Sequence, residues 1–159
     1  MDLGKLQDYT AICVLERDSR RLVHFERLRG ISWPLQRERI AEISRRFPGE
    51  LWVDSTGLGE VVCDELWREG LRPSGYCLTA EAKEQLVMHL ALGMENGEVS
   101  LPQCAAAGPL LEELTAYEYR LTPGSRLSFA APAGGHDDAV IALALAYWGL
   151  RHVPTARRL

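Results

Sequence analysis

The chain has 159 residues, of which 47% are hydrophobic and 25% are charged, and its formal net charge is −4. This composition is typical of one soluble globular domain and excludes a disordered chain. The longest apolar run, residues 139–150, is too short to cross a bilayer, so no membrane segment is expected. The negative charge argues mildly against a nucleic-acid partner, although a carboxylate site for cations would itself add negative charge.

Apolar and polar residues follow one another in an order that predicts alternating strands and helices after an initial hairpin. Alternating patterns predict strands at residues 9–16, 22–28, 50–54, 72–78, 117–121 and 126–130. Helical periodicity and end signals predict helices at residues 34–47, 61–70, 79–96, 109–119 and 137–150, the fourth of which runs into a strand. We therefore expect an α/β fold with a mixed sheet flanked by helices on both faces.

No internal repeat or low-complexity linker divides the chain. We expect one domain over residues 1–150, followed by a basic C-terminal tail over residues 151–159. The four cysteines are widely spaced and form no Cys-x-x-Cys pair, which argues against a zinc site and indicates reduced, mostly buried thiols. Cys13 and Cys77 are expected to be core strand residues.

Asp54 follows the apolar segment Leu-Trp-Val at the end of a predicted strand. An acid at the carboxyl end of a parallel strand points into the crevice in which α/β sheets bind ligands. Gly57 and Gly59 in the following turn would allow a close approach of backbone or substrate. The alternative is that Asp54 only caps the next helix, a task that Ser55 or Thr56 could already perform.

His136, Asp137 and Asp138 stand before an otherwise apolar helix and follow a glycine-rich segment. Carboxylates are favoured there by the helix macrodipole and by unpaired N–H groups, so capping is again an alternative. Two adjacent acids exceed what capping needs, and one of them could project to a metal ion. Asp2 and Asp8 form a third acidic stretch, which alone indicates only turn residues. Hard cations such as Mg²⁺ and Mn²⁺ bind such carboxylates.

Taken together and in this order, six segments of the chain resemble the nuclease domain of tailed-phage terminase large subunits, over essentially the whole chain. The segments are Asp-Leu-Gly-Lys-Leu-Gln-Asp-Tyr-Thr-Ala-Ile (2–12), Val-Asp-Ser-Thr-Gly-Leu-Gly (53–59), Thr-x-x-x-Lys-x-x-Leu (79–86), Leu-Pro (101–102), Glu-Leu-x-x-Tyr-Glu-Tyr (113–119) and Gly-His-Asp-Asp-Ala-Val-Ile-Ala-Leu-Ala-Leu-Ala (135–146). The resemblance implies a ribonuclease H-like fold with an extra β-hairpin near the active site, and a metal-dependent endonuclease acting on double-stranded DNA.

By the same resemblance, Asp2, Asp54 and Asp137 would be the core ligands of two divalent ions, Mg²⁺ or Mn²⁺. Asp8 and Asp138 would be supporting acids near the same site. In such sites two ions about 3.5–4 Å apart activate a water, orient the phosphodiester and stabilise the leaving oxygen. Carboxylates crowd together there because the cations offset their mutual repulsion.

Lys83, Arg120 and Arg126 are the candidate DNA contacts of this sequence. Lys83 matches a lysine in the family pattern and would touch DNA or an acid of the site; a solvated helix lysine is the alternative. The two arginines lie on the second hairpin, where basic and aromatic side chains could meet a DNA backbone or its bases, unless the hairpin is only a packed edge. On the helix expected at 34–47, arginines alternate with glutamates, which favours a solvated face.

The resemblance also implies partners: the terminase ATPase domain, the small terminase subunit and the portal, acting on DNA during genome packaging in the cytoplasm of a bacterial host. No Gly-x-x-x-x-Gly-Lys-Ser/Thr motif occurs, so this chain is not expected to translocate DNA by itself. Asp2 is the second residue, whereas the fold places its first acid on a central strand. Two alternatives therefore stand beside the nuclease: a catalytically silent prophage remnant that at most binds, and a related ribonuclease H-like junction resolvase.

Overall fold

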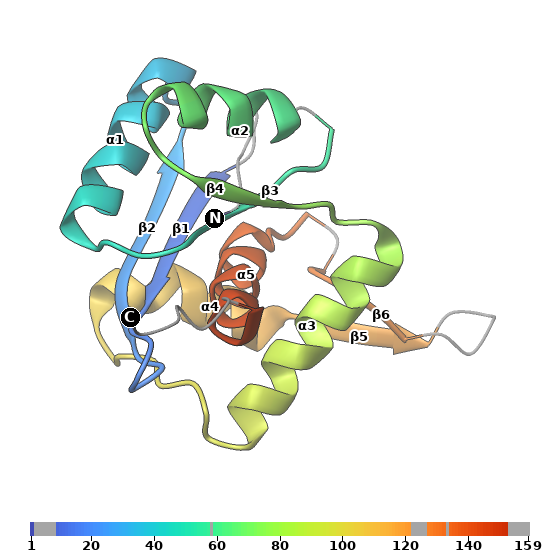
Figure 1. Ribbon diagram of the computed structural model, residues 1–159. Helices are drawn as coiled ribbons and strands as arrows, with labels where there is room; N and C mark the ends of the chain where they lie inside the picture. Colours follow the sequence, from blue (N-terminus) through green and yellow to red (C-terminus); the bar gives the residue numbers. More distant parts are fainter. Residues whose placement is uncertain (2–8, 58, 122–126, 133, 153–159) are drawn as a thin grey trace.

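A computed structural model describes residues 1, 9–57, 59–121, 127–132 and 134–152 (Figure 1). Within these residues the strands are β1 (Tyr9–Leu15), β2 (Leu22–Arg29), β3 (Leu51–Asp54), β4 (Pro73–Tyr76), β5 (Glu118–Leu121) and β6 (Leu127–Ala130). The helices are α1 (Trp33–Arg46), α2 (Gly59–Arg68), α3 (Ala80–Glu95), the short 3₁₀ turn η1 (Ala105–Ala107), α4 (Gly108–Ala116) and α5 (Asp138–His152). The predicted order of strands and helices is confirmed, and the bounds differ by a few residues.

Strands β1 and β2 form the first hairpin, antiparallel from Tyr9 opposite Arg29 to Val14 opposite His24, with a bulge before Leu15. Strand β1 is covered on both faces, because four successive residues from Thr10 to Cys13 are buried, whereas most residues of β2 are half-buried. Strands β3 and β4 form a separate parallel pair that extends from Leu51 opposite Pro73 to Asp54 opposite Tyr76. Helix α2 makes the crossover between them, as a parallel pair requires.

Met1 lies beside β3 and bonds to it as a strand residue does. Its amino group donates to the carbonyl oxygen of Trp52 at 2.8 Å, and its own carbonyl oxygen accepts from the N–H of Asp54 at 3.1 Å. This pattern is that of parallel pairing, with Met1 opposite Val53. Met1 is also buried, at 4% exposure, so the start of the described chain is part of the core.

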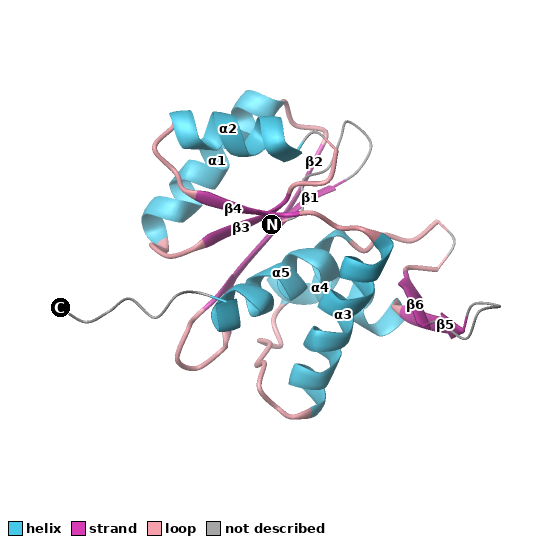
Figure 2. Ribbon diagram, turned by 45° about the vertical axis from the view of Figure 1, so that its right-hand side comes forward, coloured by secondary structure: helices cyan, strands magenta, loops and turns pink. Residues whose placement is uncertain are grey.

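Helix α5 is the centre of the fold. Nine of its 15 residues are buried, because it is apolar on every side and is packed against β1, β3, α3 and α4. Figure 2 shows α1 and α2 on one side of the strands and α3, α4 and α5 on the other. Gly93 permits the close approach of α3 to α5, because a Cβ there would lie 2.5 Å from the ring of Tyr147.

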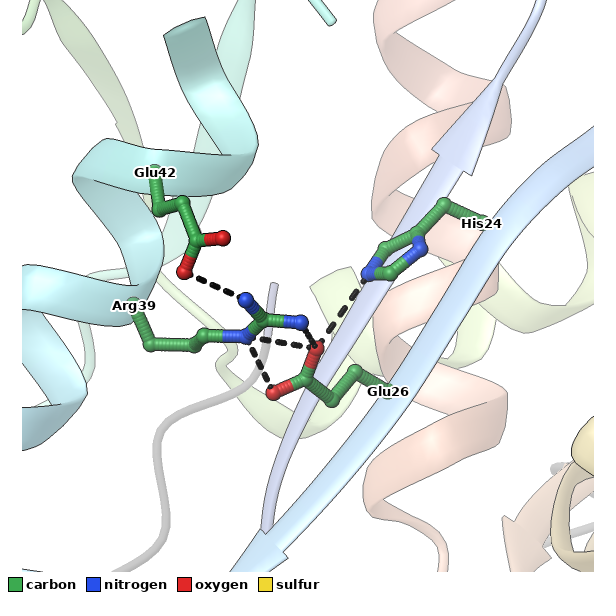
Figure 3. A network of polar contacts seen from close by, with 4 residues as sticks. All are labelled: His24, Glu26, Arg39 and Glu42. Atoms are coloured by element: carbon green, nitrogen blue, oxygen red, sulfur yellow. Dashed lines mark hydrogen bonds and ion pairs between the residues drawn. The ribbon is translucent and has the colours of Figure 1, made fainter. Parts of the chain in front are cut away.

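A polar network fixes α1 to the outer face of β2 (Figure 3). Arg39 donates from Nε to both carboxylate oxygens of Glu26, at 2.7 and 2.8 Å, and its guanidinium also pairs with Glu42. This contact holds the pKa of Glu26 below its usual value, chiefly through the hydrogen bonds from Arg39. Arg39 is thus engaged by protein carboxylates from both β2 and α1.

The expectation for the cysteines is half right. Cys13 is buried in β1, and its burial raises the pKa of its thiol to about 12. Cys77, expected in a core strand, is exposed, because β4 ends at Tyr76 and Cys77 lies in the connection to α3. Cys104 is exposed as well. Among the described residues no helix is both long and apolar enough to cross a membrane.

Candidate metal centre

Asp54 is the last residue of β3, and the turn that follows it is built around its side chain. Its Oδ1 accepts hydrogen bonds from the N–H of Thr56 at 2.8 Å and from the Thr56 hydroxyl at 2.6 Å. Short side chains that bond to the backbone two residues on are typical of such turns. The turn uses Oδ1 alone, and Oδ2 accepts no hydrogen bond from the described residues. The carboxylate therefore keeps one oxygen with which to bind a cation.

The hydroxyl of Thr56 connects this turn to the start of α3. It accepts from the N–H of Leu78 at 2.8 Å, and the next residue, Thr79, is the N-cap of α3, where its side chain accepts from the N–H of Ala82. The predicted cap is confirmed. The end of β3 and the first turn of α3 are consequently held together by side-chain to backbone hydrogen bonds.

Asp137 contacts a side chain from the first turn of α3. The Lys83 ammonium donates to Asp137 Oδ2 at 2.6 Å, and the Tyr117 hydroxyl lies 3.4 Å from the same oxygen. Burial, followed by the charge of Asp137, raises the pKa of Tyr117, so this phenol stays protonated and donates. Asp137 is itself the residue before α5, and its carbonyl oxygen accepts from the N–H of Ile141. Its carboxylate is thus positioned by α5 and neutralised by a cation from α3.

Asp138, the first residue of α5, lies in a more enclosed position. Its side chain is 14% exposed, its Oδ2 accepts no hydrogen bond from the residues that the structure describes, and His136 Nδ1 lies 3.7 Å from that oxygen. Burial, with a further contribution from the charge of Glu113, raises its pKa from 3.8 to about 6. A buried carboxylate oxygen without a donor is costly in a protein unless it binds a cation or a proton.

Glu113 of α4 holds the beginning of α5. It is buried at 7% exposure, and its Oε2 accepts from the N–H of Ala139 at 2.8 Å. Its Oε1 pairs with Arg27 of β2 at 3.0 Å, and the Arg27 guanidinium lies 3.6 Å from the ring centroid of Tyr9. Glu113 begins the segment 113–119 that carries part of the resemblance, but neither Glu113 nor Arg27 is among the predicted site residues. A signal existed in α4, because Glu113 is three residues after the buried Leu110 and so shares its apolar face.

For the remaining predicted site residues, the structure describes only one backbone position. Asp2, Asp8 and Arg126 lie outside the described residues. Arg120 is in β5, paired with Ser128 of β6, and the structure describes its backbone alone. The hairpin of β5 and β6 projects beside α3 (Figure 1), and Tyr117, which contacts Asp137, is the residue just before it.

The donors that the structure describes suit a hard divalent cation. Asp54, Asp137 and Asp138 supply carboxylate oxygens, and the buried, unpartnered Oδ2 of Asp138 is of the kind that a cation would satisfy. The Lys83 ammonium beside Asp137 shows that this position accepts positive charge. Within the described part of the chain, no group of three or more His, Cys, Asp or Glu side chains lies so that the group by itself could hold a metal ion.

Known proteins resemble this chain in sequence and in structure. Residues 1–149 match the family described as the terminase RNaseH-like domain. The chain is 36% identical over 149 residues to the terminase large subunit of Thermus virus P23-45, a match that covers 92% of this chain and 30% of that protein.

Two solved structures share the fold. The large terminase nuclease from thermophilic phage G20c with bound magnesium has a TM-score of 0.82 at 34% identity, over 92% of this chain and 77% of that one. The Thermus phage P74-26 large terminase nuclease domain has a TM-score of 0.82 at 33% identity, over 93% and 76%. The G20c nuclease also has structures with bound cobalt and with bound zinc.

The arrangement of helices on both sides of the strands, with acids at the end of β3 and the start of α5, defines a ribonuclease H-like domain. The chain belongs to the terminase RNaseH-like domain family. The match covers 30% of the length of the terminase large subunit of Thermus virus P23-45.

Proposed function

We propose that this chain is the metal-dependent nuclease domain of a phage or prophage terminase large subunit. Its reaction is the hydrolysis of phosphodiester bonds in double-stranded DNA during genome packaging. The proposal is supported by the family match over residues 1–149 and by the likeness to nuclease domains of known structure, one of them with bound magnesium. It assigns to this chain an activity that the described residues support through their charge and placement.

The observation that carries the proposal is the ion pair between Lys83 and Asp137. A carboxylate at the start of a buried helix is held by an ammonium from α3, and Leu78, two residues before α3, donates to Thr56 in the turn of Asp54. A helix cap needs no such counter-charge, because it is satisfied by backbone N–H groups. This counter-charge supports the proposal that Asp137 would bind a divalent cation in the active protein.

Asp54 and Asp137 would hold the metal together with Asp2, and Asp8 and Asp138 would support the site. We expect two ions, either Mg²⁺ or Mn²⁺, because the available donors are oxygens. When bound, the ions supply Lewis-acid activation of water and stabilisation of the leaving oxygen. The residues of this chain fix the acids: Thr56 orients Asp54, Tyr117 and Lys83 orient Asp137, and the hydrogen bond from Ala139 to Glu113 anchors the start of α5.

Lys83 has a second task in this proposal. If Asp137 held a divalent cation, the Lys83 ammonium would be free to contact a phosphate of the DNA. Arg120 and Arg126 of the hairpin would contact the backbone beside it, as basic side chains do in protein–DNA interfaces. The ATPase domain, the small terminase subunit and the portal would be the partners of the full-length protein in the cytoplasm of the bacterial host.

Plasmid cleavage tests the proposal. The purified chain is incubated with supercoiled plasmid and Mg²⁺, Mn²⁺ or EDTA, beside Asp54→Asn, Asp137→Asn and the matched control Asp64→Asn, which alters an exposed acid of α2. We expect metal-dependent cutting that is lost in the first two variants and kept in the control. Full cutting by Asp137→Asn would overturn the assignment. A marked preference for branched over linear duplex DNA would instead identify a junction resolvase.

A further inference from the structure

Tyr9, the first residue of β1, connects the hairpin of β1 and β2 to the residues that precede α5. Its ring lies edge-on to the imidazole of His136, with 4.8 Å between the two ring centroids. The next residue, Asp137, pairs instead with Lys83 of α3. Two successive residues of the candidate metal centre therefore contact different neighbours, β1 and α3, and Figure 1 shows α5 between these two elements.

Two arginines of β2 gather around the ring of Tyr9. Arg29 lies directly opposite Tyr9 in the hairpin and Arg27 lies two residues earlier, so the three side chains share one face of the strands. The Arg27 guanidinium lies 3.6 Å from the ring centroid, and that of Arg29 lies 5.1 Å from it. Arg29 Nη1 also donates to the Tyr9 hydroxyl at 3.3 Å. The ring of Tyr9 thus holds two positive charges beside His136, at the edge of the metal centre.

The two guanidinium groups differ in how their charge is balanced. Arg27 is 16% exposed and pairs with the buried Glu113 at 3.0 Å. Arg29 is exposed, and none of the residues that the structure describes supplies it with a carboxylate. Lys83, the cation on the α3 side of the centre, is paired with Asp137. Within the described part of the chain, Arg29 is therefore the one of these three cations whose charge remains available to an anion from outside the protein.

We propose that Arg29, held by Tyr9 and flanked by His136, contacts a phosphate group of the DNA on the β2 side of the metal centre. The acids of the centre repel phosphates, so a duplex needs fixed positive charge nearby in order to approach them. Arginine suits this task because its planar guanidinium can donate to two phosphate oxygens at once. The inference rests on the proposed function, and it assigns a contact that lies across α5 from Lys83.

Such a contact acts on the binding of DNA rather than on bond cleavage. Among the described residues, Arg29 contacts Tyr9 and none of the acids of the centre, so removing its charge leaves the positions of Asp54 and Asp137 unchanged. Contacts to phosphates fix the register and orientation of a duplex without reading its sequence. Loss of Arg29 should therefore weaken DNA binding equally for all sequences and preserve the rate of cleavage of bound DNA.

The salt dependence of DNA binding tests the proposal. A short fluorescent duplex is titrated with the unaltered chain, Arg29→Gln, Arg29→Lys and the matched control Arg45→Gln, in Ca²⁺, a hard cation that also prefers oxygen ligands. Arg45 is exposed in the last turn of α1, at the far end of the helix that follows β2. We expect Arg29→Gln alone to weaken binding about three- to tenfold at about 0.1 M salt, and to reduce the slope of log K against log salt by about 0.9. Arg29→Lys keeps the charge and should restore most of that slope.

Steady-state cleavage in Mg²⁺ gives a second readout, in which Arg29→Gln should raise KM by a similar factor and keep kcat. Equal salt slopes for Arg29→Gln and Arg45→Gln would overturn the inference, whatever their cleavage rates. A lower kcat at unchanged KM would also overturn it, because Arg29 would then act on the metal centre itself. Arg29-dependent binding by a chain that cuts no DNA would overturn the proposed nuclease function while supporting the phosphate contact.

Discussion

The Lys83 ammonium lies 2.6 Å from Asp137 Oδ2, on the residue that immediately precedes α5. The two residues are 54 positions apart, and their side chains are 32% and 25% exposed, so water partly screens the pair. Exposed ion pairs contribute little to stability, typically up to about 1 kcal/mol. The contact is therefore more informative about charge at this site than about the stability of the fold.

Replacing Lys83 by Met should change the response of the protein to divalent ions. Without the ammonium, Asp137 is less well neutralised, and the metal-free protein should lose up to about 1 kcal/mol of unfolding free energy. Added Mg²⁺ should then raise Tm more in Lys83→Met than in the unaltered chain, because the ion no longer competes with the ammonium. Thermal unfolding with EDTA and with Mg²⁺ measures this. Identical Mg²⁺ shifts in both proteins would show that Lys83 and the metal occupy different places.

Glu113 should be a structural determinant of the site. Glu113→Gln would weaken its pairing with Arg27, which is 16% exposed, and leave a buried guanidinium poorly compensated. We expect a loss of about 1–3 kcal/mol, measured by urea unfolding. Glu112→Gln is the matched control, because Glu112 is the exposed neighbour on the same helix, and it should change stability little. A loss of equal size in both variants would contradict the role of Glu113.

The pH dependence of stability should reveal Asp138. Its pKa is raised from 3.8 to about 6, so the folded state binds this proton more tightly than the unfolded state does. The unfolding free energy therefore falls as pH rises from about 4 to about 6. Above about pH 6, the folded state bears the full destabilisation from the ionised, buried carboxylate. In EDTA, Asp138→Asn should be more stable than the unaltered chain by on the order of 1–3 kcal/mol above pH 6, with little difference at pH 4. Parallel stability–pH curves for the two proteins would refute this.

The rate of reaction with a maleimide should distinguish the buried cysteine from the exposed ones. Cys13 has a pKa raised to about 12 and is buried, so it should react with a maleimide only when the protein opens. Cys77 and Cys104 are exposed and should react within minutes at neutral pH. Mass spectrometry of labelled peptides gives the order of modification. Rapid labelling of Cys13 in the folded protein would contradict its place in the core.

Gly93→Ala should be destabilising through packing. The new methyl group would lie 2.5 Å from the ring of Tyr147, whose hydroxyl is held by Glu98 at 2.7 Å, so α3 and α5 would have to move apart. Overpacking of this kind costs about 1–3 kcal/mol. Gly108→Ala is the matched control, because a Cβ there meets nothing within 4 Å. Calorimetry should show a lower Tm for the first variant alone.

The sequence by itself determined the order of the elements and several of their ends. Thr79 caps α3 as its type and position predict, and α5 is a buried helix because its residues are apolar on every side. These features depend on residues close together in the chain, where local hydrogen bonds and periodicity dominate. Asp54 and Asp137 stand at element ends for the same reason.

Only the tertiary structure decided which side chains meet. Lys83 reaches Asp137, Arg27 pairs with Glu113, and Cys77 faces solvent although its neighbours are apolar. These outcomes depend on how α3, α4 and α5 pack, and no local pattern encodes the distance between residues that are far apart in sequence.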